Sequence, residues 1–175
     1  MTITQTIERT TLSNLVSNEE YCRKVLPFIK ADYFDVKEER VVFEEITNFV
    51  EKYKRIPTKI SLEIEVESRK DLTQDQHTKI VEIIQTLDAT DVDMEWLVDT
   101  TEKFCKDKAI YNAIVDGISI IDGKDKKRSA DAIPSILTDA LAVCFDNAVG
   151  HDYFDDAEER FEFYHKIEER IPFDL

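Results

Sequence analysis

Few residues in this sequence could carry chemistry, and the clearest group is a Glu-x-x-His pair near the carboxyl end. Glu162 and His165 have the spacing by which helical bundles hold two iron or manganese ions, and Glu169 follows one turn later. Such a centre needs a second copy of the motif, and neither His77 nor His151 stands in one. We therefore expect a solvated helix face here, with a metal centre as the alternative.

Neither nucleotide binding nor nucleophilic catalysis has a supporting motif. The glycines are Gly117, Gly123 and Gly150, and none stands in a GxxxxGK[ST] segment, the loop that cradles the phosphates of ATP. No serine or cysteine lies beside a histidine and an acid in a recognisable catalytic motif. The sequence therefore predicts no catalytic residue, no cofactor-binding residue and no metal ligand in this chain.

Composition narrows the class of protein further. The 175 residues carry 23 basic and 38 acidic side chains, a net charge of −15, which argues against a general binder of nucleic acid or anionic membranes. Three glycines and four prolines supply few tight turns, which favours helices. Cys22, Cys105 and Cys144 are odd in number and widely spaced, so we expect reduced, mostly buried thiols. With no membrane span or signal peptide in the sequence, we expect a cytoplasmic protein.

Residues 93–149 have the dominant pattern, two long apolar segments joined by a short polar loop. In the first segment Leu97, Phe104, Tyr111 and Ile118 recur every seven residues, beside a second row of Ile110, Ile114 and Ile121. The second segment has helical spacing in Ile133, Leu137, Ala140, Leu141, Cys144 and Ala148. Gly123 and Gly150 stand where helices commonly end in a left-handed residue. We therefore predict an antiparallel helical hairpin.

This hairpin has apolar residues on more sides than two helices can cover for each other. We therefore expect part of it to pack against further copies of the chain. The candidate residues for a subunit interface are Trp96, Leu97, Phe104, Tyr111, Ile118, Leu137 and Leu141. The alternative is that some of them belong to the core of the chain itself.

The first 92 residues are expected to form a small head of short helices. Asn18 is placed to cap a helix with acidic residues first and basic residues last, which Pro27 should end. Asp35 is expected to cap a strongly amphipathic helix that stops before Pro57, because a residue preceding proline avoids helical geometry. The apolar face of that helix carries Val42, Ile46, Phe49, Val50 and Tyr53, and its other faces largely carry Glu38, Glu39, Glu44, Glu45, Glu51 and Lys52.

One stretch of the head has an ambiguous pattern. From Ser61 to Arg69 apolar and acidic residues alternate as they do in a β-strand. No second strand is available to pair with it, and an isolated strand leaves its backbone groups unsatisfied, so we expect a short helix. The next helix begins at Thr73, where Gln76 completes a capping box. The sequence thus predicts an all-α fold.

Residues 150–175 are expected to form a linker region with one amphipathic helix, from about Asp155 to Arg170. From His151 to Leu175 the segment has nine acidic and three basic residues, a net charge of −6. An amphipathic helix beyond a glycine joint is a common ligand for a groove on another subunit. The candidate docking residues are Phe161, Tyr164 and Ile167, and packing on the same chain is the alternative.

The loop of the hairpin is the one local basic feature. It carries Lys124, Lys126, Lys127 and Arg128 around Asp125. Such a cluster can bind DNA phosphates or an acidic partner surface. It can equally complement the dipole of the preceding helix and keep the loop solvated, so we assign it only a weak contact role.

The order of these elements resembles the amino-terminal region of DnaB-type replicative DNA helicases, most closely those of T-even-like bacteriophages. The resemblance covers nearly the whole chain as a pattern of helices and short strings, without a catalytic signature. The strings that carry it are Leu12–Leu15, Asn18–Ile29, Asp32–Phe34, Glu39–Ile46, Lys54–Thr58 and Arg170–Leu175.

The resemblance implies a specific place in a larger machine. In that family a helical head and hairpin form the collar of a hexameric ring, often as a trimer of dimers, and a linker helix packs on the motor domain of the adjacent subunit. The collar receives the primase within the primosome, and the ring encircles single-stranded DNA. ATP and magnesium serve the motor domain, which would come after Leu175, so these residues alone should have no helicase activity. A helicase loader is a further expected partner.

A different class of function fits the same residues, namely a free-standing acidic helical adaptor or helicase-loading protein. The two hypotheses differ in the gene sequence that they require after Leu175. The collar hypothesis requires a Walker-type GxxxxGK[ST] segment there, whereas the adaptor hypothesis requires none.

Overall fold

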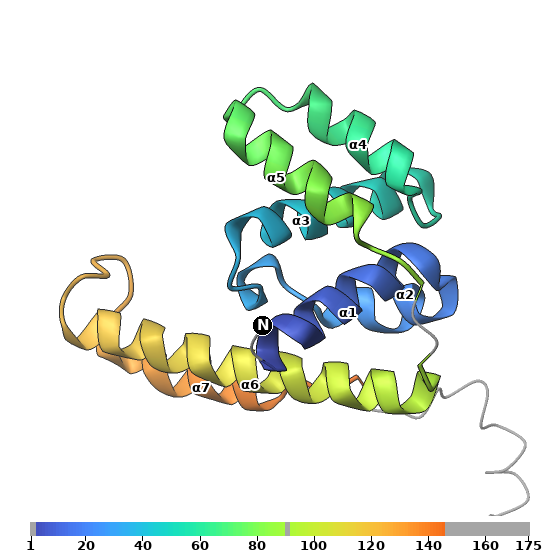
Figure 1. Cartoon of the computed structure of the whole chain (residues 1–175). Coiled ribbons are helices and arrows are strands. Elements are labelled where there is room, and N and C mark those ends of the chain that lie inside the picture. The colour runs from blue at the N-terminus through green and yellow to red at the C-terminus, as the bar shows by residue number, and fades with distance from the viewer. Residues whose placement is uncertain (1–2, 90–91, 146–175) are drawn as a thin grey trace, which may run out of the picture. The chain divides into compact units, whose positions relative to one another are not determined.

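This computed structural model describes residues 3–89 and 92–145, which belong to one compact unit ending at Phe145 (Figure 1). No β-strand occurs among these residues, so the predicted all-α fold is confirmed. The α-helices are α1 (Ile3–Ser17), α2 (Glu19–Val25), α3 (Lys37–Tyr53), α4 (Lys59–Ser68), α5 (Gln74–Gln85), α6 (Met94–Ile121) and α7 (Ile133–Leu141). Short 3-10 helices lie at Leu26–Phe28 (η1), Ala31–Tyr33 (η2) and Ala130–Ala132 (η3).

Helices of the head pack in two groups above the hairpin. α3, α4 and α5 pack on one another, while α1 contacts α2, α3 and α6 (Figure 1). The first helix thus lies between the α3–α5 group and the hairpin formed by α6 and α7. Its buried side chains Leu12 and Leu15 join the same apolar core as Phe34, Ile46 and Ile84. One continuous core therefore holds the head and the first half of α6 together.

Local capping explains where several helices begin. The Asn18 side chain accepts a hydrogen bond from the Tyr21 backbone N–H at 3.0 Å and starts α2 as predicted. α2 ends at Val25, before Pro27, which lies in η1. Thr73 and Gln76 form the predicted capping box of α5. These signals are short-range, so the sequence was sufficient to find them.

The ambiguous stretch around Ser61 is helical, as predicted. α4 begins at Lys59, two residues before the predicted start, because Thr58 and Ser61 form a capping box of their own. Leu62 and Val66, one turn apart, are fully buried, whereas Ile60 and Ile64 are exposed. The stretch with the alternating pattern is therefore a helix that buries one narrow row of side chains, Leu62 and Val66.

The expected cap of α3 by Asp35 is wrong. Val36 occupies the N-cap position and no side chain caps the helix. The Asp35 carboxylate instead accepts a hydrogen bond from the Lys108 ammonium at 2.5 Å. The Asp35 carboxylate, which the local pattern predicted as the cap of α3, therefore pairs with a residue that is distant in the sequence.

The polar faces expected for α3 also need correction. Glu39 and Glu45 are buried rather than solvated, whereas Tyr53, expected on the apolar face, is exposed. Glu39 pairs with Arg9 of α1, and Glu45 lies 3.0 Å from the Arg69 guanidinium. Buried carboxylates need such partners, and these come from elsewhere in the chain. Among the predicted apolar residues Val42, Ile46 and Phe49 are buried as expected.

The hairpin is asymmetric. α6 is a continuous helix of 28 residues, and Gly123 follows it with a left-handed φ of 68°, as its position predicted. α7 has 9 residues and ends at Leu141, earlier than the apolar spacing suggested. Beyond it Phe145 stacks on Phe28 with ring centroids 4.8 Å apart, which returns the chain to the head. Ala148 and Gly150 lie outside the described residues.

Candidate assembly surface

The first half of α6 is part of the core of the head. Leu97, Phe104 and Cys105 are buried, and the Phe104 ring lies edge-on to Phe34 with centroids 6.4 Å apart. Thr101 lies on the same part of α6 and accepts a hydrogen bond of 2.6 Å from the Tyr21 hydroxyl of α2. The Thr101 hydroxyl in turn donates to the Leu97 carbonyl. Leu97 and Phe104 therefore take the alternative foreseen for the interface candidates, a place in the core of this chain.

The second half of α6 contacts α7 through small residues. Ala109, Ala113 and Gly117 are spaced four apart and all are buried. A Cβ atom at Gly117 would lie 3.6 Å from the Ile133 side chain, so α7 approaches the α6 backbone closely. Ala140 is the buried residue of α7, and Leu137 is partly buried beside it. The two helices of the hairpin thus pair through one narrow face of α6.

Large apolar side chains of the second half of α6 are left exposed, away from these small residues. Steps of three and four residues place them on adjacent turns of the helix, so that they form one continuous surface. Their exposed fractions run from 43% to 72%. This surface, which we name the α6 stripe, consists of Tyr111, Ile114, Val115, Ile118 and Ile121.

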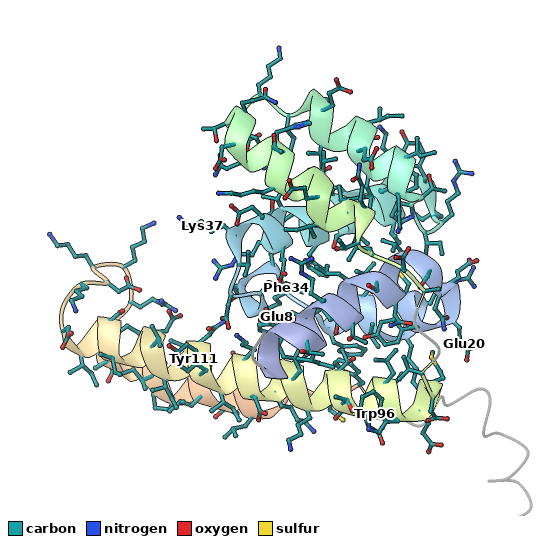
Figure 2. All side chains as sticks on the ribbon, in the orientation of Figure 1. Glu8, Glu20, Phe34, Lys37, Trp96 and Tyr111 are labelled. Atoms are coloured by element: carbon teal, nitrogen blue, oxygen red, sulfur yellow. The ribbon has the colours of Figure 1, made fainter. Side chains whose placement is uncertain are left out.

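Two of the other interface candidates are exposed, and Leu137 is partly buried. Trp96 near the start of α6 and Leu141 at the end of α7 are exposed, and Figure 2 shows Trp96 and Tyr111 along the same helix. The sequence predicted Tyr111 and Ile118 as interface residues and placed Ile114 and Ile121 in the neighbouring row. Val115 was missed, because it belongs to neither apolar row, and only the observed position of α7 shows that its side of α6 is uncovered.

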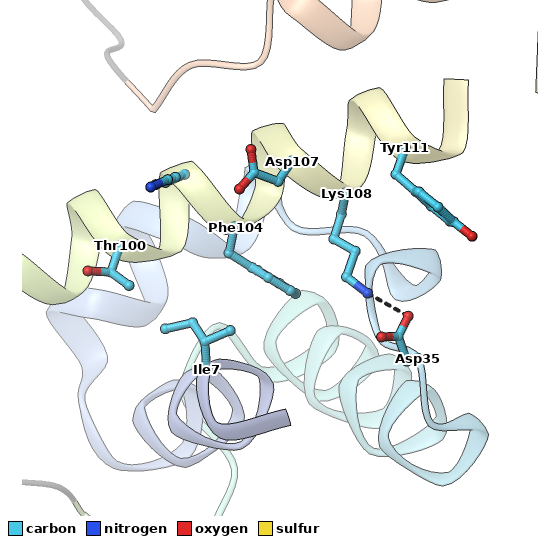
Figure 3. A pocket seen from close by; sticks show the side chains of 8 residues that line it. Ile7, Asp35, Thr100, Phe104, Asp107, Lys108 and Tyr111 are labelled. Atoms are coloured by element: carbon cyan, nitrogen blue, oxygen red, sulfur yellow. Dashed lines mark hydrogen bonds and ion pairs between the residues drawn. The ribbon is translucent and has the colours of Figure 1, made fainter. Parts of the chain in front are cut away.

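A cavity of about 590 Å³ adjoins the α6 stripe at Tyr111 (Figure 3). Ile7 of α1 and Phe104 of α6 form its apolar wall, and Lys108 and Asp35 form an ion pair at its edge. The remaining lining residues are Thr100, Lys103 and Asp107, all on α6. The apolar surface therefore continues from the hairpin into a recess beside the head.

A charge cluster at the edge of this cavity fastens α6 to the head. Glu8 is fully buried, and its carboxylate accepts a hydrogen bond of 3.2 Å from the Asp35 backbone and lies 3.4 Å from the Lys108 ammonium. Burial raises the pKa of Glu8 above its ordinary value of 4.5, although the Asp35 N–H and the Lys108 charge both oppose the rise. Lys108 thus connects α6 to α1 through Glu8 and to the segment before α3 through Asp35.

Two of the four basic side chains of the hairpin loop form ion pairs with acidic neighbours. Lys124 lies 2.9 Å from Asp122, and Arg128 lies 2.7 Å from Asp116 and 2.6 Å from Asp125. Within the described residues Lys126 and Lys127 form no ion pair, and both are exposed. The loop is therefore organised largely by its own ion pairs, and two of its four cations stay available for a contact.

The described residues contain no group of three or more histidine, cysteine or acidic side chains that could hold a metal ion. Burial raises the pKa of the Cys22 thiol to about 11 and that of Cys105 to about 12, so neither forms a reactive thiolate at neutral pH. Among these residues no helix is long and apolar enough to cross a membrane. Glu162, His165 and the docking candidates Phe161, Tyr164 and Ile167 lie outside the described residues.

Fold and surface together define a class of protein. The described residues form an all-helical unit, and an exposed apolar face such as the α6 stripe is typical of a surface that contacts another protein. Comparison with known proteins adds a relative. The chain is 31% identical over 172 residues to the DnaB-like replicative helicase of Enterobacteria phage T4, an alignment that covers 94% of this chain and 36% of that protein. No protein-family model matches the chain.

This similarity confirms the resemblance to DnaB-type replicative helicases. The chain spans about a third of the length of the relative. Because the aligned part covers almost the whole chain, it includes both the head and the hairpin. The similarity in sequence therefore extends over most of the described residues.

Proposed function

We propose that this chain is the collar and oligomerisation region of a hexameric replicative DNA helicase. The similarity to a replicative helicase supports a role in DNA replication. The observation that carries the assembly role is the α6 stripe, an exposed apolar face that α7 does not cover. Removal of such a face from water favours association by roughly 25 cal/mol for each Å² that is buried.

A second copy of the same surface is the partner that we propose for the α6 stripe. The stripe is self-complementary in chemistry, because all its members are apolar or aromatic, and a two-fold pair of helices would bury both copies at once. Such pairs are the units of a ring built as a trimer of dimers.

The remaining partners belong to the same proposal. The collar would contact the primase and a helicase loader, and the complete ring would encircle single-stranded DNA. The relative is nearly three times as long as its aligned part, which leaves room for a motor domain that uses ATP and magnesium. Phe161, Tyr164 and Ile167 are proposed to dock on a neighbouring subunit.

The mass of the protein in solution tests the assembly role. Ile118→Asp places a charge in the α6 stripe, and we expect a folded protein of lower oligomeric mass by light scattering, because burying an unpaired charge at an interface costs several kcal/mol. Ile64→Asp is the matched control, since Ile64 is a similarly exposed isoleucine on α4. Equal masses for Ile118→Asp and the parent would refute the proposed interface, as would a monomeric parent at every concentration tested.

A further inference from the structure

A second, smaller recess lies between α2 and the carboxyl end of α3. Its volume is about 180 Å³, and its apolar lining includes the partly exposed side chains of Leu26, Val50 and Ile56. A cavity of this size is too small for a cofactor, which usually needs several hundred Å³. It is large enough to receive one apolar side chain of a partner. We name this recess the α2–α3 cleft.

The charged residues that line the α2–α3 cleft are three cations, Arg23, Lys54 and Arg55, and one acid, Glu19, so its rim has a net positive charge. Lys54 and Arg55 are exposed and form no hydrogen bond or ion pair through their side chains with any described residue. Arg23 pairs with Glu19 of its own helix at 2.5 Å, and such an exposed pair holds its partners only weakly. The whole chain has a net charge of −15, whereas the rim of this apolar recess has a net positive charge.

The backbone at Lys54 is a separate observation. Lys54 has φ 55° and ψ 30°, and among the described residues it is the one non-glycine residue with a positive φ. Helices commonly end in this conformation at a glycine, because any side chain there is strained. Lys52 in the last turn already complements the dipole of α3. The dipole therefore gives no reason for a lysine, rather than glycine, at the strained position.

We propose that the α2–α3 cleft is a docking site for an acidic segment of a partner protein. One apolar side chain of the segment enters the recess, and its carboxylates face Arg23, Lys54 and Arg55. An apolar floor under a cationic rim suits such a peptide better than a chain of phosphates, which has no apolar group to bury. The site shares no residue with the α6 stripe, so it does not depend on the proposed assembly role.

Binding of a designed peptide tests this site on the full chain. The probe is a fluorescein-labelled peptide of aspartate and glutamate residues around a single leucine, followed by fluorescence anisotropy. Lys54→Glu combined with Arg55→Glu should weaken binding about tenfold, because like charges then face each other. Lys37→Glu combined with Lys70→Glu makes the same change of net charge at two exposed lysines that form no ion pair with any described residue and do not line the cleft, and it should leave binding unchanged.

Two further measurements separate the proposal from simpler explanations. Lys54→Gly should melt at the same or a higher temperature than the parent, since glycine relieves the strained backbone, and yet bind the peptide several-fold more weakly. Replacing the leucine of the probe with asparagine should also weaken binding. A parent that does not bind the probe would overturn the site. So would equal binding of both probes with displacement by single-stranded oligothymidine, which would indicate a phosphate site instead.

Discussion

The two halves of α6 carry the same apolar repeat, but the head covers only the first half. Leu97 and Phe104 lie in the core, whereas Tyr111 and Ile118, one and two repeats further along, are exposed. Nothing in the residue types distinguishes these pairs, since each contains one aromatic and one aliphatic side chain. What differs is the neighbour, because α1 and α2 pack on the first half. The second half contacts α7, η3 and, through Asn112, Asp32 of η2, and none of these covers Tyr111 and Ile118. An apolar repeat therefore predicts that a surface is covered without predicting what covers it.

The largest expected effect lies in the first half. Phe104→Asp should lower the free energy of unfolding by about 4 kcal/mol, because it removes the contact with Phe34 and buries a charge without a partner. Urea denaturation followed by circular dichroism measures this loss. Tyr111→Asp, one repeat further along, should change the stability by no more than about 0.5 kcal/mol when both proteins are compared at a concentration at which they are monomeric. Similar losses for both variants would show that the two halves are covered alike.

A hydrogen bond in the first half gives a smaller effect. Tyr21→Phe removes the hydroxyl that donates to Thr101 at 2.6 Å. Thr101 still donates to the Leu97 carbonyl, so no buried donor is stranded and the loss should be about 1 kcal/mol. Thermal unfolding of the variant measures it, and Tyr111→Phe in the exposed half is the control. A loss above about 3 kcal/mol would mean that the hydroxyl supports more than this one contact.

In the second half the contact with α7 can be probed at its closest point. Gly117→Ala should raise the free energy of unfolding by roughly 0.5 to 1 kcal/mol, because glycine is unfavourable inside a helix and the added methyl group makes ordinary contact with Ile133. Gly117→Leu should instead cost about 1 to 3 kcal/mol by forcing α7 away. Thermal unfolding distinguishes the two, and a destabilised Gly117→Ala would mean that the hairpin is packed more tightly than the 3.6 Å distance indicates.

The charge cluster at Glu8 gives an effect that depends on pH. Burial raises the pKa of Glu8, so the folded protein favours the protonated acid. The stability that protonation supplies is complete below the ordinary pKa of 4.5 and is lost as the pH rises through the folded value. Glu8→Gln is neutral and still accepts from the Asp35 N–H. Its melting temperature should therefore exceed that of the parent most at neutral pH, and the difference should shrink on acidification.

An acid with the opposite shift supplies the control for that experiment. The Arg69 guanidinium lowers the pKa of Asp71, so the stability from this pair is present at neutral pH and is lost as the pH falls through the folded value. Asp71→Asn should remove that dependence and leave the behaviour at higher pH due to Glu8 intact. If the melting temperatures of Glu8→Gln and Asp71→Asn depended on pH in the same way, the proposed effect of burial on the pKa of Glu8 would be wrong.

The sequence was a good guide wherever structure depends on neighbours along the chain. Asn18 and Thr73 cap their helices as predicted, and Gly123 ends α6 in the left-handed conformation. The lack of a pairing strand correctly predicts a helix from Ser61, and the Thr58 capping box, which is also a local signal, starts that helix at Lys59.

Long-range partners explain what the sequence could not predict. Asp35 stands where a helix cap is expected, but Lys108, 73 residues later, takes its carboxylate. Glu39 has the same appearance in the sequence as its partly exposed neighbour Glu38, yet it is buried and pairs with Arg9 of α1. The division of the interface candidates into core and surface likewise depends on where α1, α2 and α7 pack. None of these contacts leaves a local signal.

The continuity of α6 has a mechanical consequence. At 1.5 Å per residue the 28 residues from Met94 to Ile121 form a rod of about 42 Å, with no proline inside it to act as a hinge. The half of this rod that begins at Met94 is held in the head through Leu97 and Phe104, and its other end reaches the hairpin loop. A force applied at the loop is therefore transmitted as a lever to α1 and α2, and whatever holds the hairpin also orients the head.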